Sequence, residues 1–147
     1  MYFNRISRQT WLPLGVALIS AISVVGSYSS IAAAADVKLT LTGDHEVPPV
    51  KSAGTGAGVI VIGTDRSVSG SVTTTGIAGT AAHIHEAAAG KNGPVVIPLT
   101  KNGETYSVPA GAKFTDAQFA SYKAGNLYIN VHTAANPGGE LRAQLKP

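Results

Sequence analysis

The stretch Ala82-His83-Ile84-His85-Glu86, taken together with Asn130-Val131-His132-Thr133, organises the chain. Each is a short run around isoleucine or valine with turn signals nearby, which is typical of a β-strand. Alternate side chains of a strand leave on the same face. His83 and His85 therefore point the same way, separated by roughly 7 Å of backbone, and Ile84 points to the opposite face. We expect a strand that presents two imidazoles on one side.

The segments before this stretch predict further strands. Residues 37–42 alternate apolar and polar side chains, which indicates a half-buried strand. Residues 59–62 are a continuous run of β-branched apolar side chains, which predicts a buried strand. Residues 51–58 are rich in small side chains and are expected to form a loop. After a turn at residues 63–66, alternation resumes over residues 67–75 and predicts a hairpin.

The segments after it predict two more hairpins. Residues 95–99 form a short strand-like run that precedes Asn102-Gly103, the pair that favours a type I′ turn. Residues 127–133 and 140–145 are joined by Asn136-Pro137-Gly138-Gly139, a turn sequence. With seven or eight short strands in all, the pattern indicates an antiparallel sandwich or flattened barrel.

One helix is predicted. Thr115 is a good N-cap, Gln118 occupies the capping-box position, and Gly125 stands where a C-terminal glycine belongs. Phe119 and Tyr122 are spaced to share one face, which we expect to pack on a sheet.

The N-terminus has the pattern of a secretory signal peptide. Arg5 and Arg8 supply positive charge, residues 11–25 are apolar, and a run of alanines follows. We expect residues 1–35 to be cleaved and residues 36–147 to form one periplasmic or secreted domain. The alternative is an uncleaved N-terminal anchor.

The charge and the cysteine content limit the classes of partner and of covalent link that we expect for this protein. Two of the eleven lysines and arginines lie in the leader, which leaves nine against eight acidic residues in a nearly neutral domain. No basic run interleaves with aromatic residues, so we expect no nucleic-acid partner, and no membrane partner after cleavage. The absence of cysteine excludes disulfides and a lipoprotein anchor.

Five motifs occur in order along residues 37–145: Glu46-Val47-Pro48-Pro49-Val50, Ala82-His83-Ile84-His85, residues 90–94, residues 125–133, and Pro137-Gly138-Gly139-Glu140-Leu141-Arg142. Together they resemble the CHRD domain family, named from the repeated domains of chordin. The resemblance implies an immunoglobulin-like barrel or sandwich in an exported protein. It implies the fold more firmly than the function, which is undefined for most bacterial members. His45 stands where an amide is common.

A weaker resemblance is to the copper-zinc superoxide dismutases. His83-Ile84-His85-Glu86 is similar to their His-x-His pair on a sandwich strand, and residues 138–142 are faintly similar to their late glycine-arginine segment. A disulfide pair and a histidine-rich zinc loop are missing. The expected fold class is thus all-β: an antiparallel, immunoglobulin-like or superoxide-dismutase-like Greek-key sandwich or barrel with one short helix.

The histidines predict a transition-metal site. His83, His85 and His132 are the expected ligands, with His45 as an optional fourth. Imidazole-rich ligation favours copper or zinc. We expect one copper ion, with zinc as the alternative, because three or four imidazoles on rigid strands suit Cu(II) and no thiolate competes. In the alternative interpretation, the imidazoles bond backbone carbonyls and each other and pin two strands together.

Four further residues are candidates to support the ligands. Glu46 or Glu86 is expected to accept a hydrogen bond from the free ring nitrogen of a ligating histidine. Glu46 alternatively caps backbone amides beside Pro48-Pro49, and Glu86 is alternatively a solvated strand-end residue. Asn130 shares a strand face with His132 and is expected either to support the ligands or to bridge strands as a buried amide. Arg142 either pairs with Glu140 or lies over the site.

No catalytic residue is predicted. The chain lacks cysteine and a Gly-x-Ser-x-Gly elbow, and its eight acidic residues are scattered singly along the sequence. The expected function is metal handling or storage without catalysis. The alternatives are a metal-free adhesion module that binds another exported protein, and a dismutase-like redox enzyme, which requires an open coordination position.

Overall fold

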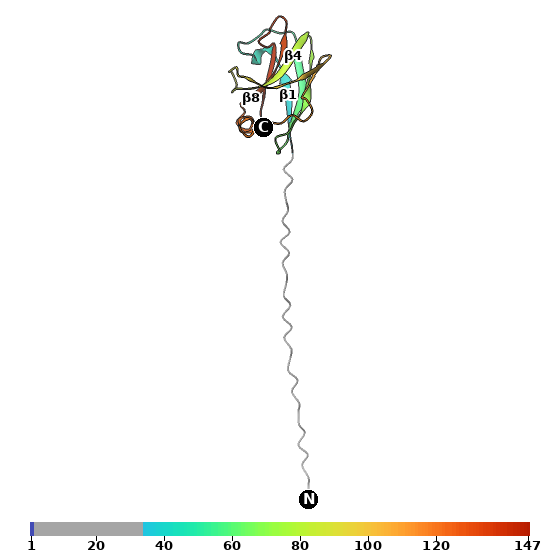
Figure 1. Cartoon of the computed structure of the whole chain (residues 1–147), viewed down its shortest axis with the longest axis vertical. Coiled ribbons are helices and arrows are strands. Elements are labelled where there is room, and N and C mark those ends of the chain that lie inside the picture. The colour runs from blue at the N-terminus through green and yellow to red at the C-terminus, as the bar shows by residue number, and fades with distance from the viewer. Residues whose placement is uncertain (2–33) are drawn as a thin grey trace. The chain divides into compact units, whose positions relative to one another are not determined.

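The structure is a computed structural model that describes Met1 and residues 34–147. The predicted signal peptide therefore lies almost wholly outside the described residues, and the division of the chain at residue 35 stays a prediction. From residue 35 onward the chain forms two antiparallel sheets and one α-helix (Figure 1). The elements are β1 (Ala35–Leu41), the 3₁₀ helix η1 (Gly43–His45), β2 (Thr55–Ile62), β3 (Val68–Thr75), β4 (Gly79–Glu86), β5 (Val95–Pro98), β6 (Thr100–Asn102), β7 (Thr105–Ser107), α1 (Asp116–Lys123), β8 (Leu127–Thr133) and β9 (Leu141–Leu145).

The two sheets make an open sandwich. One has the strand order β1-β2-β3-β7-β6 and the other β5-β4-β8-β9. Within the described residues, the single backbone pairing between the two sheets at this edge is an isolated bridge that joins Thr42, directly after β1, to Arg142 of β9. The all-β antiparallel sandwich with one helix is confirmed, whereas a closed barrel is not formed, because the sheets keep edge strands.

The core lies between the sheets and is filled by alternate aliphatic side chains. In β2, Ile60 and Ile62 are buried while Val59 is 37% exposed. The prediction of a wholly buried strand was therefore wrong, because β2 covers the core with one face only. The predicted loop over residues 51–58 also ends early, since β2 begins at Thr55. The buried apolar residues are Val37, Leu39, Leu41, Ile60, Ile62, Val68, Val72, Ala82, Ile84, Ile97, Tyr106, Phe114, Tyr122, Leu127, Tyr128, Ile129, Val131, Leu141, Ala143 and Leu145.

Gly58 allows β2 to pair closely with β3. A Cβ at Gly58 would lie 2.1 Å from the carbonyl oxygen of Ser71 on β3. The close approach of backbone to backbone requires glycine there, so the small residues of this segment serve a strand rather than a loop.

The predicted strand over residues 95–99 is confirmed as β5, which ends at Pro98, but it does not form the hairpin across the turn at residue 103. β5 pairs with β4, and after Leu99 the chain enters β6, which pairs with β7 in the other sheet. Asn102 pairs with Thr105, so the hairpin turn is Gly103-Glu104 rather than Asn102-Gly103. Only Gly103 of these two has a positive φ, 59°. The hairpin is confirmed, but its type I′ turn was wrong because that turn needs positive φ at both positions.

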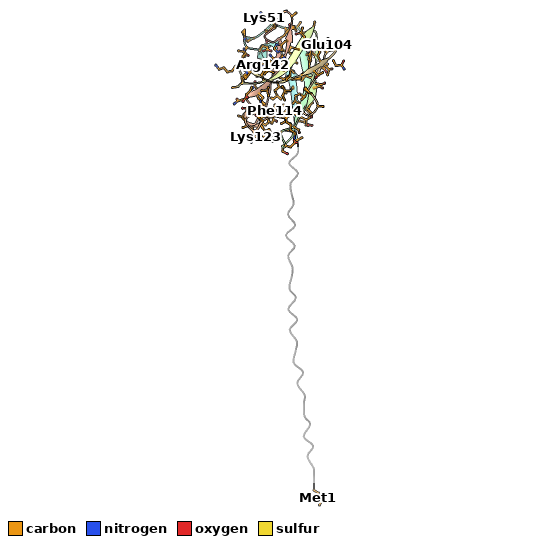
Figure 2. The ribbon with its side chains drawn as sticks, in the orientation of Figure 1. Met1, Lys51, Glu104, Phe114, Lys123 and Arg142 are labelled. Atoms are coloured by element: carbon orange, nitrogen blue, oxygen red, sulfur yellow. The ribbon has the colours of Figure 1, made fainter. Side chains whose placement is uncertain are left out.

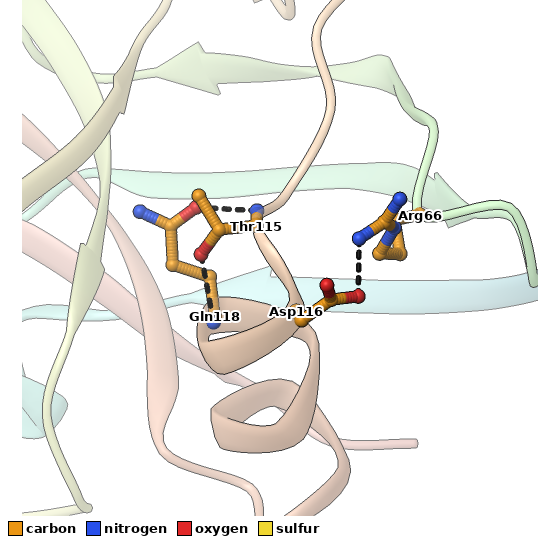
Figure 3. Close-up of polar contacts among 4 residues, drawn as sticks. All are labelled: Arg66, Thr115, Asp116 and Gln118. Atoms are coloured by element: carbon orange, nitrogen blue, oxygen red, sulfur yellow. Dashed lines mark hydrogen bonds and ion pairs between the residues drawn. The ribbon is translucent and has the colours of Figure 1, made fainter.

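Helix α1 begins at the predicted cap. The hydroxyl of Thr115 accepts a hydrogen bond from the backbone amide of Gln118, and the Gln118 side chain accepts one from the amide of Thr115 (Figure 3). Arg66 on the β2–β3 turn pairs with Asp116 in the first turn of the helix. Phe119 and Tyr122 contact each other, and Tyr122 is buried, so the predicted packing face is confirmed. Among the described residues, no helix has the length and apolar character that crossing a membrane requires.

We expect Ile60→Ala to lower the free energy of unfolding by about 2–5 kcal/mol, because the deletion leaves a cavity in a fully buried position. The matched control is its neighbour Val59→Ala, which should cost about 1 kcal/mol or less, the range of strand propensities. Urea unfolding measures both. Equal losses for the two variants would contradict the assigned faces of β2.

Candidate metal centre

The outer face of the four-stranded sheet carries polar side chains. In β8, Ile129 and Val131 face the core, so Tyr128, Asn130 and His132 point to the other side. In the antiparallel pairing of β4 with β8, His85 lies opposite Tyr128, His83 opposite Asn130, and Ala81 opposite His132. This register puts all three predicted histidine ligands on one face.

The three imidazoles come together as the sequence predicted. Nδ1 of His83 lies 2.9 Å from Nε2 of His132. Each of His83, His85 and His132 offers one ring nitrogen, and these nitrogens all lie within 4.8 Å of one another. The ring centroids of His83 and His85 are 5.5 Å apart. A group of this size and chemistry is able to converge on a single ion.

Backbone carbonyls fix two of the rings. Nδ1 of His85 lies 2.9 Å from the carbonyl oxygen of Gly93, and Nδ1 of His132 lies 2.9 Å from that of Pro137. A carbonyl only accepts, so both Nδ1 atoms carry a proton, and in the neutral form of each ring Nε2 keeps a lone pair. In that form the lone pair of His132 accepts a hydrogen bond from Nδ1 of His83. Nε2 of His85 is buried and has no hydrogen-bond partner.

The His85 ring stacks on Tyr128, and Tyr128 in turn contacts the guanidinium of Arg142. The Tyr128 ring stacks on the His85 ring with centroids 4.8 Å apart and an angle of 7° between the planes. The guanidinium of Arg142 lies 3.4 Å from the Tyr128 centroid (Arg142 is labelled in Figure 2). Arg142 donates to the carbonyl of Lys91 and to Oδ1 of Asn92, so it also ties the β4–β5 loop to the sheet.

Arg142 therefore lies over the aromatic side of the site, as one of the two sequence alternatives had it. It does not pair with Glu140 in the described structure, where Glu140 instead accepts hydrogen bonds from Ser52, Thr133 and Asn136. Those contacts hold the β8–β9 turn that supplies the Pro137 carbonyl.

Glu46 and Asn130 form a buried polar layer beside the histidines. Glu46 is 4% exposed, and its Oε1 atom has no hydrogen-bond partner. Asn130 donates from Nδ2 to the carbonyl of Gly138, while its Oδ1 atom is unpartnered. Burial raises the pKa of the Glu46 carboxyl, against the opposing effects of the Arg142 charge and Asn130. Gly139 has a φ of 133°, and a Cβ there would lie 2.3 Å from Oε1 of Glu46, so a larger residue would strain the backbone and displace this carboxyl.

Two predicted site residues lie elsewhere. His45 is exposed on η1 and is not part of the three-histidine group. Glu86 accepts a hydrogen bond from Oγ of Ser121 on α1, so it joins the helix to β4 instead of contacting a histidine. The carboxylates of Glu46 and Glu86 were expected to accept these ring protons. The backbone carbonyls of Gly93 and Pro137 accept them instead, because they lie 2.9 Å from the two Nδ1 atoms.

Burial lowers the pKa of His83 and of His85. For His83 the neighbouring His132 and His85 lower the pKa further, and for His85 the hydrogen bond to Gly93 opposes the effect of burial. Both rings are thus neutral at neutral pH, which is the form that binds a metal.

The structure adds residues that the motif reading had missed. Tyr128 lies directly opposite His85, and strand alternation from His132 would have placed it on the same face. The carbonyls of Gly93 and Pro137 leave no signal in the sequence, because any residue has a carbonyl oxygen.

A family model for the CHRD domain matches residues 37–145. Because this span is most of the chain, the protein belongs to the CHRD domain family. CHRD domains are generally extracellular β-domains. A comparison with curated proteins finds no match. A comparison with solved structures also finds none.

We expect the metal-free protein to lose stability as the pH falls from 6.5 toward the lowered pKa values of His83 and His85. In that range the unfolded chain binds more protons than the native state, and stability falls wherever this holds as pH decreases. Thermal unfolding in a chelator between pH 7.5 and 5 measures the effect.

The double variant His83→Gln/His85→Gln should show a smaller loss over the same range, whereas the control His45→Gln should keep the wild-type loss. Glu46 acts with the opposite sign, because its raised pKa favours the native state at low pH, and the comparison between variants cancels it. Parallel pH profiles for all three proteins would contradict the assignment.

Proposed function

We propose that this CHRD-domain protein is exported and that it binds one transition-metal ion through His83, His85 and His132. Its role would be metal handling or storage. The observation that carries the proposal is the unpartnered Nε2 of His85. This nitrogen is buried beside the hydrogen-bonded rings of His83 and His132. A buried polar atom without a hydrogen-bond partner costs about 1–3 kcal/mol of stability. An ion bound by the three rings would remove that cost.

The donor set favours copper, with zinc as the alternative. Three imidazoles without thiolate or carboxylate suit both metals, and sites of this kind generally bind Cu(II) more tightly than Zn(II). Hydrogen bonds from Nδ1 to Gly93 and Pro137 support this role, because ligating histidines usually donate their other ring proton and are oriented by it. Three protein ligands would leave a coordination position for water or for a ligand from a metal carrier.

A metal-free module is less well supported. If the histidines only pinned β4 to β8, each buried ring nitrogen should find a partner in the protein. The contact between His83 and His132 meets this requirement, but His85 does not. Export to the periplasm or the medium is part of the proposal and rests on the leader-like pattern of residues 1–35 and on the family.

We expect the purified protein to bind about one equivalent of Cu(II), and His85→Ala and His132→Ala each to weaken binding at least about tenfold, the scale seen when a metal site loses a supporting group. Competition titration with a copper chelator measures the affinity, and the absorption and electron paramagnetic resonance spectra report nitrogen ligation.

His45→Ala is the matched control, because it removes a histidine outside the group and should leave affinity unchanged. Stoichiometric, unweakened binding by the double variant His85→Ala/His132→Ala would refute the site. Superoxide turnover by the copper-loaded protein would move the function to a redox enzyme.

We expect bound copper to stabilise the domain. At a free ion concentration of one hundred times Kd, stabilisation should be about 2.7 kcal/mol if the unfolded chain binds no metal. Thermal unfolding with and without excess chelator measures it. An unchanged Tm, with partner binding intact, would favour the adhesion module over the metal-binding protein.

A further inference from the structure

β1 and β9 lie side by side at one corner of the sandwich. The amide of Thr42, directly after β1, donates to the carbonyl of Arg142 over 3.2 Å, and the amide of Arg142 donates to the carbonyl of Thr42 over 3.0 Å. The two strands stay close together beside this antiparallel bridge. Counting back along β1 and forward along β9 from the bridge places Lys38 opposite Lys146.

The two lysines point outward from this corner. Their neighbours Leu39 and Leu145 are buried in the core, and side chains alternate between the two faces of a strand. Lys38 and Lys146 are accordingly exposed. Like charges directly opposite each other on neighbouring strands are destabilising. In the described part of the chain neither lysine forms an ion pair, so no carboxylate offsets their repulsion.

A cavity of about 670 Å³ lies over this corner, with both lysines in its lining. Residues of β1 and β9 form its floor. Its walls come from η1 and the segment that follows it, through residues 44–47 and 49, and from the β4–β5 loop, through residues 89 and 90. The volume lies within the range of about 300–1,000 Å³ that is usual for small-molecule sites. We name this hollow the corner cavity.

The charged groups around the corner cavity favour an anion. Arg142, which also lines it, is 1% exposed, and its printed hydrogen bonds go to neutral oxygens. Among the described residues Arg142 is in no ion pair either. Of the two acids in the lining, Glu46 is buried and Asp44 is exposed. Three cations therefore border the cavity against one exposed carboxylate.

The rest of the lining favours an aliphatic ligand. Val47, Pro49 and Ala89 supply apolar side chains from the loop walls. Within the described residues, no phenylalanine, tyrosine or tryptophan lines the cavity, so it offers none of these rings for stacking a flat ligand. A hydrocarbon chain suits such walls, because the burial of apolar surface is favourable in any orientation.

We propose that the corner cavity binds an aliphatic carboxylate of medium chain length. The carboxylate lies between Lys38 and Lys146, where charge-assisted hydrogen bonds from both ammonium groups replace their mutual repulsion. The hydrocarbon chain lies along the loop walls toward the bridge, over a span of roughly 13 Å, the length of four strand residues. This function goes beyond metal binding and does not depend on the histidines.

The test is isothermal titration calorimetry of the full chain with butyrate, hexanoate and octanoate in excess chelator, which keeps copper out of the measurement. We expect the affinity to rise about fourfold for each added methylene, because each buried methylene contributes a similar free energy. Octanol and octyltrimethylammonium carry the same chain without the negative charge. Both should bind at least tenfold more weakly than octanoate.

Two variants locate the site. Lys38→Gln/Lys146→Gln should weaken octanoate binding at least tenfold, whereas the matched control Lys101→Gln/Lys123→Gln removes two lysines outside the lining and should leave it unchanged. Ala89→Phe places a large side chain in the wall and should abolish binding. Because Ala89 is exposed, this variant should keep the wild-type Tm.

The lysine pair has a second readout that needs no ligand. Lys146→Gln removes one of two like charges, so it should raise the Tm at low ionic strength. The increase should vanish in about 1 M salt, where charges are screened within a few ångströms. A Tm that does not rise at low salt would overturn the placement of the two lysines.

Four further results would overturn the proposal: no heat of binding at millimolar octanoate, equal binding of octanol, an affinity independent of chain length, or unchanged binding by Ala89→Phe. Equal binding of octanol would leave a merely apolar surface, and independence of chain length would leave loose attraction to lysines. None of these results bears on copper binding, so the two proposals stand or fall separately.

Discussion

The pairing of β4 with β8 is the constraint on which the rest of the structure depends. It places Ile84 opposite Ile129 in the core and, one residue away on each strand, His85 opposite Tyr128 on the outer face. A slip of one residue would turn every side chain of the strand over, and the core would lose its isoleucines as the site lost its histidines. Packing in the core therefore also fixes the geometry of the metal centre.

The loops then convert a row of histidines into an oriented site. The β4–β5 loop supplies the Gly93 carbonyl and the β8–β9 turn supplies that of Pro137, and each sets which ring nitrogen keeps its lone pair. Arg142 links the β4–β5 loop to the histidine site. Its guanidinium donates a hydrogen bond to that loop and stacks on Tyr128, which in turn stacks on His85. The polar outer face of the four-stranded sheet is thus stabilised by hydrogen bonds and ring stacking, and the opposite face by the apolar core.

Strand β9 supports the site from its place beside β8. The side chain of Arg142 bonds the β4–β5 loop, and Nε2 of Gln144 donates to the carbonyls of Ala87 and Gly125. Leu141, Ala143 and Leu145 of the same strand are buried in the core. One face of β9 therefore packs in the core while the other holds the loops, as strand alternation requires.

The sequence by itself determined the all-β class, the helix with its Thr115 cap, and the strand faces that carry His83, His85 and His132, because periodicity and capping are local. It misplaced the turn at Gly103 and the exposure of Val59, since register and burial depend on the partner strand. Only the tertiary structure decided that His45 stays outside the group and that Glu86 contacts α1. It also decided which carbonyls orient the rings, because backbone atoms are the same in every residue and their positions depend on how distant loops pack.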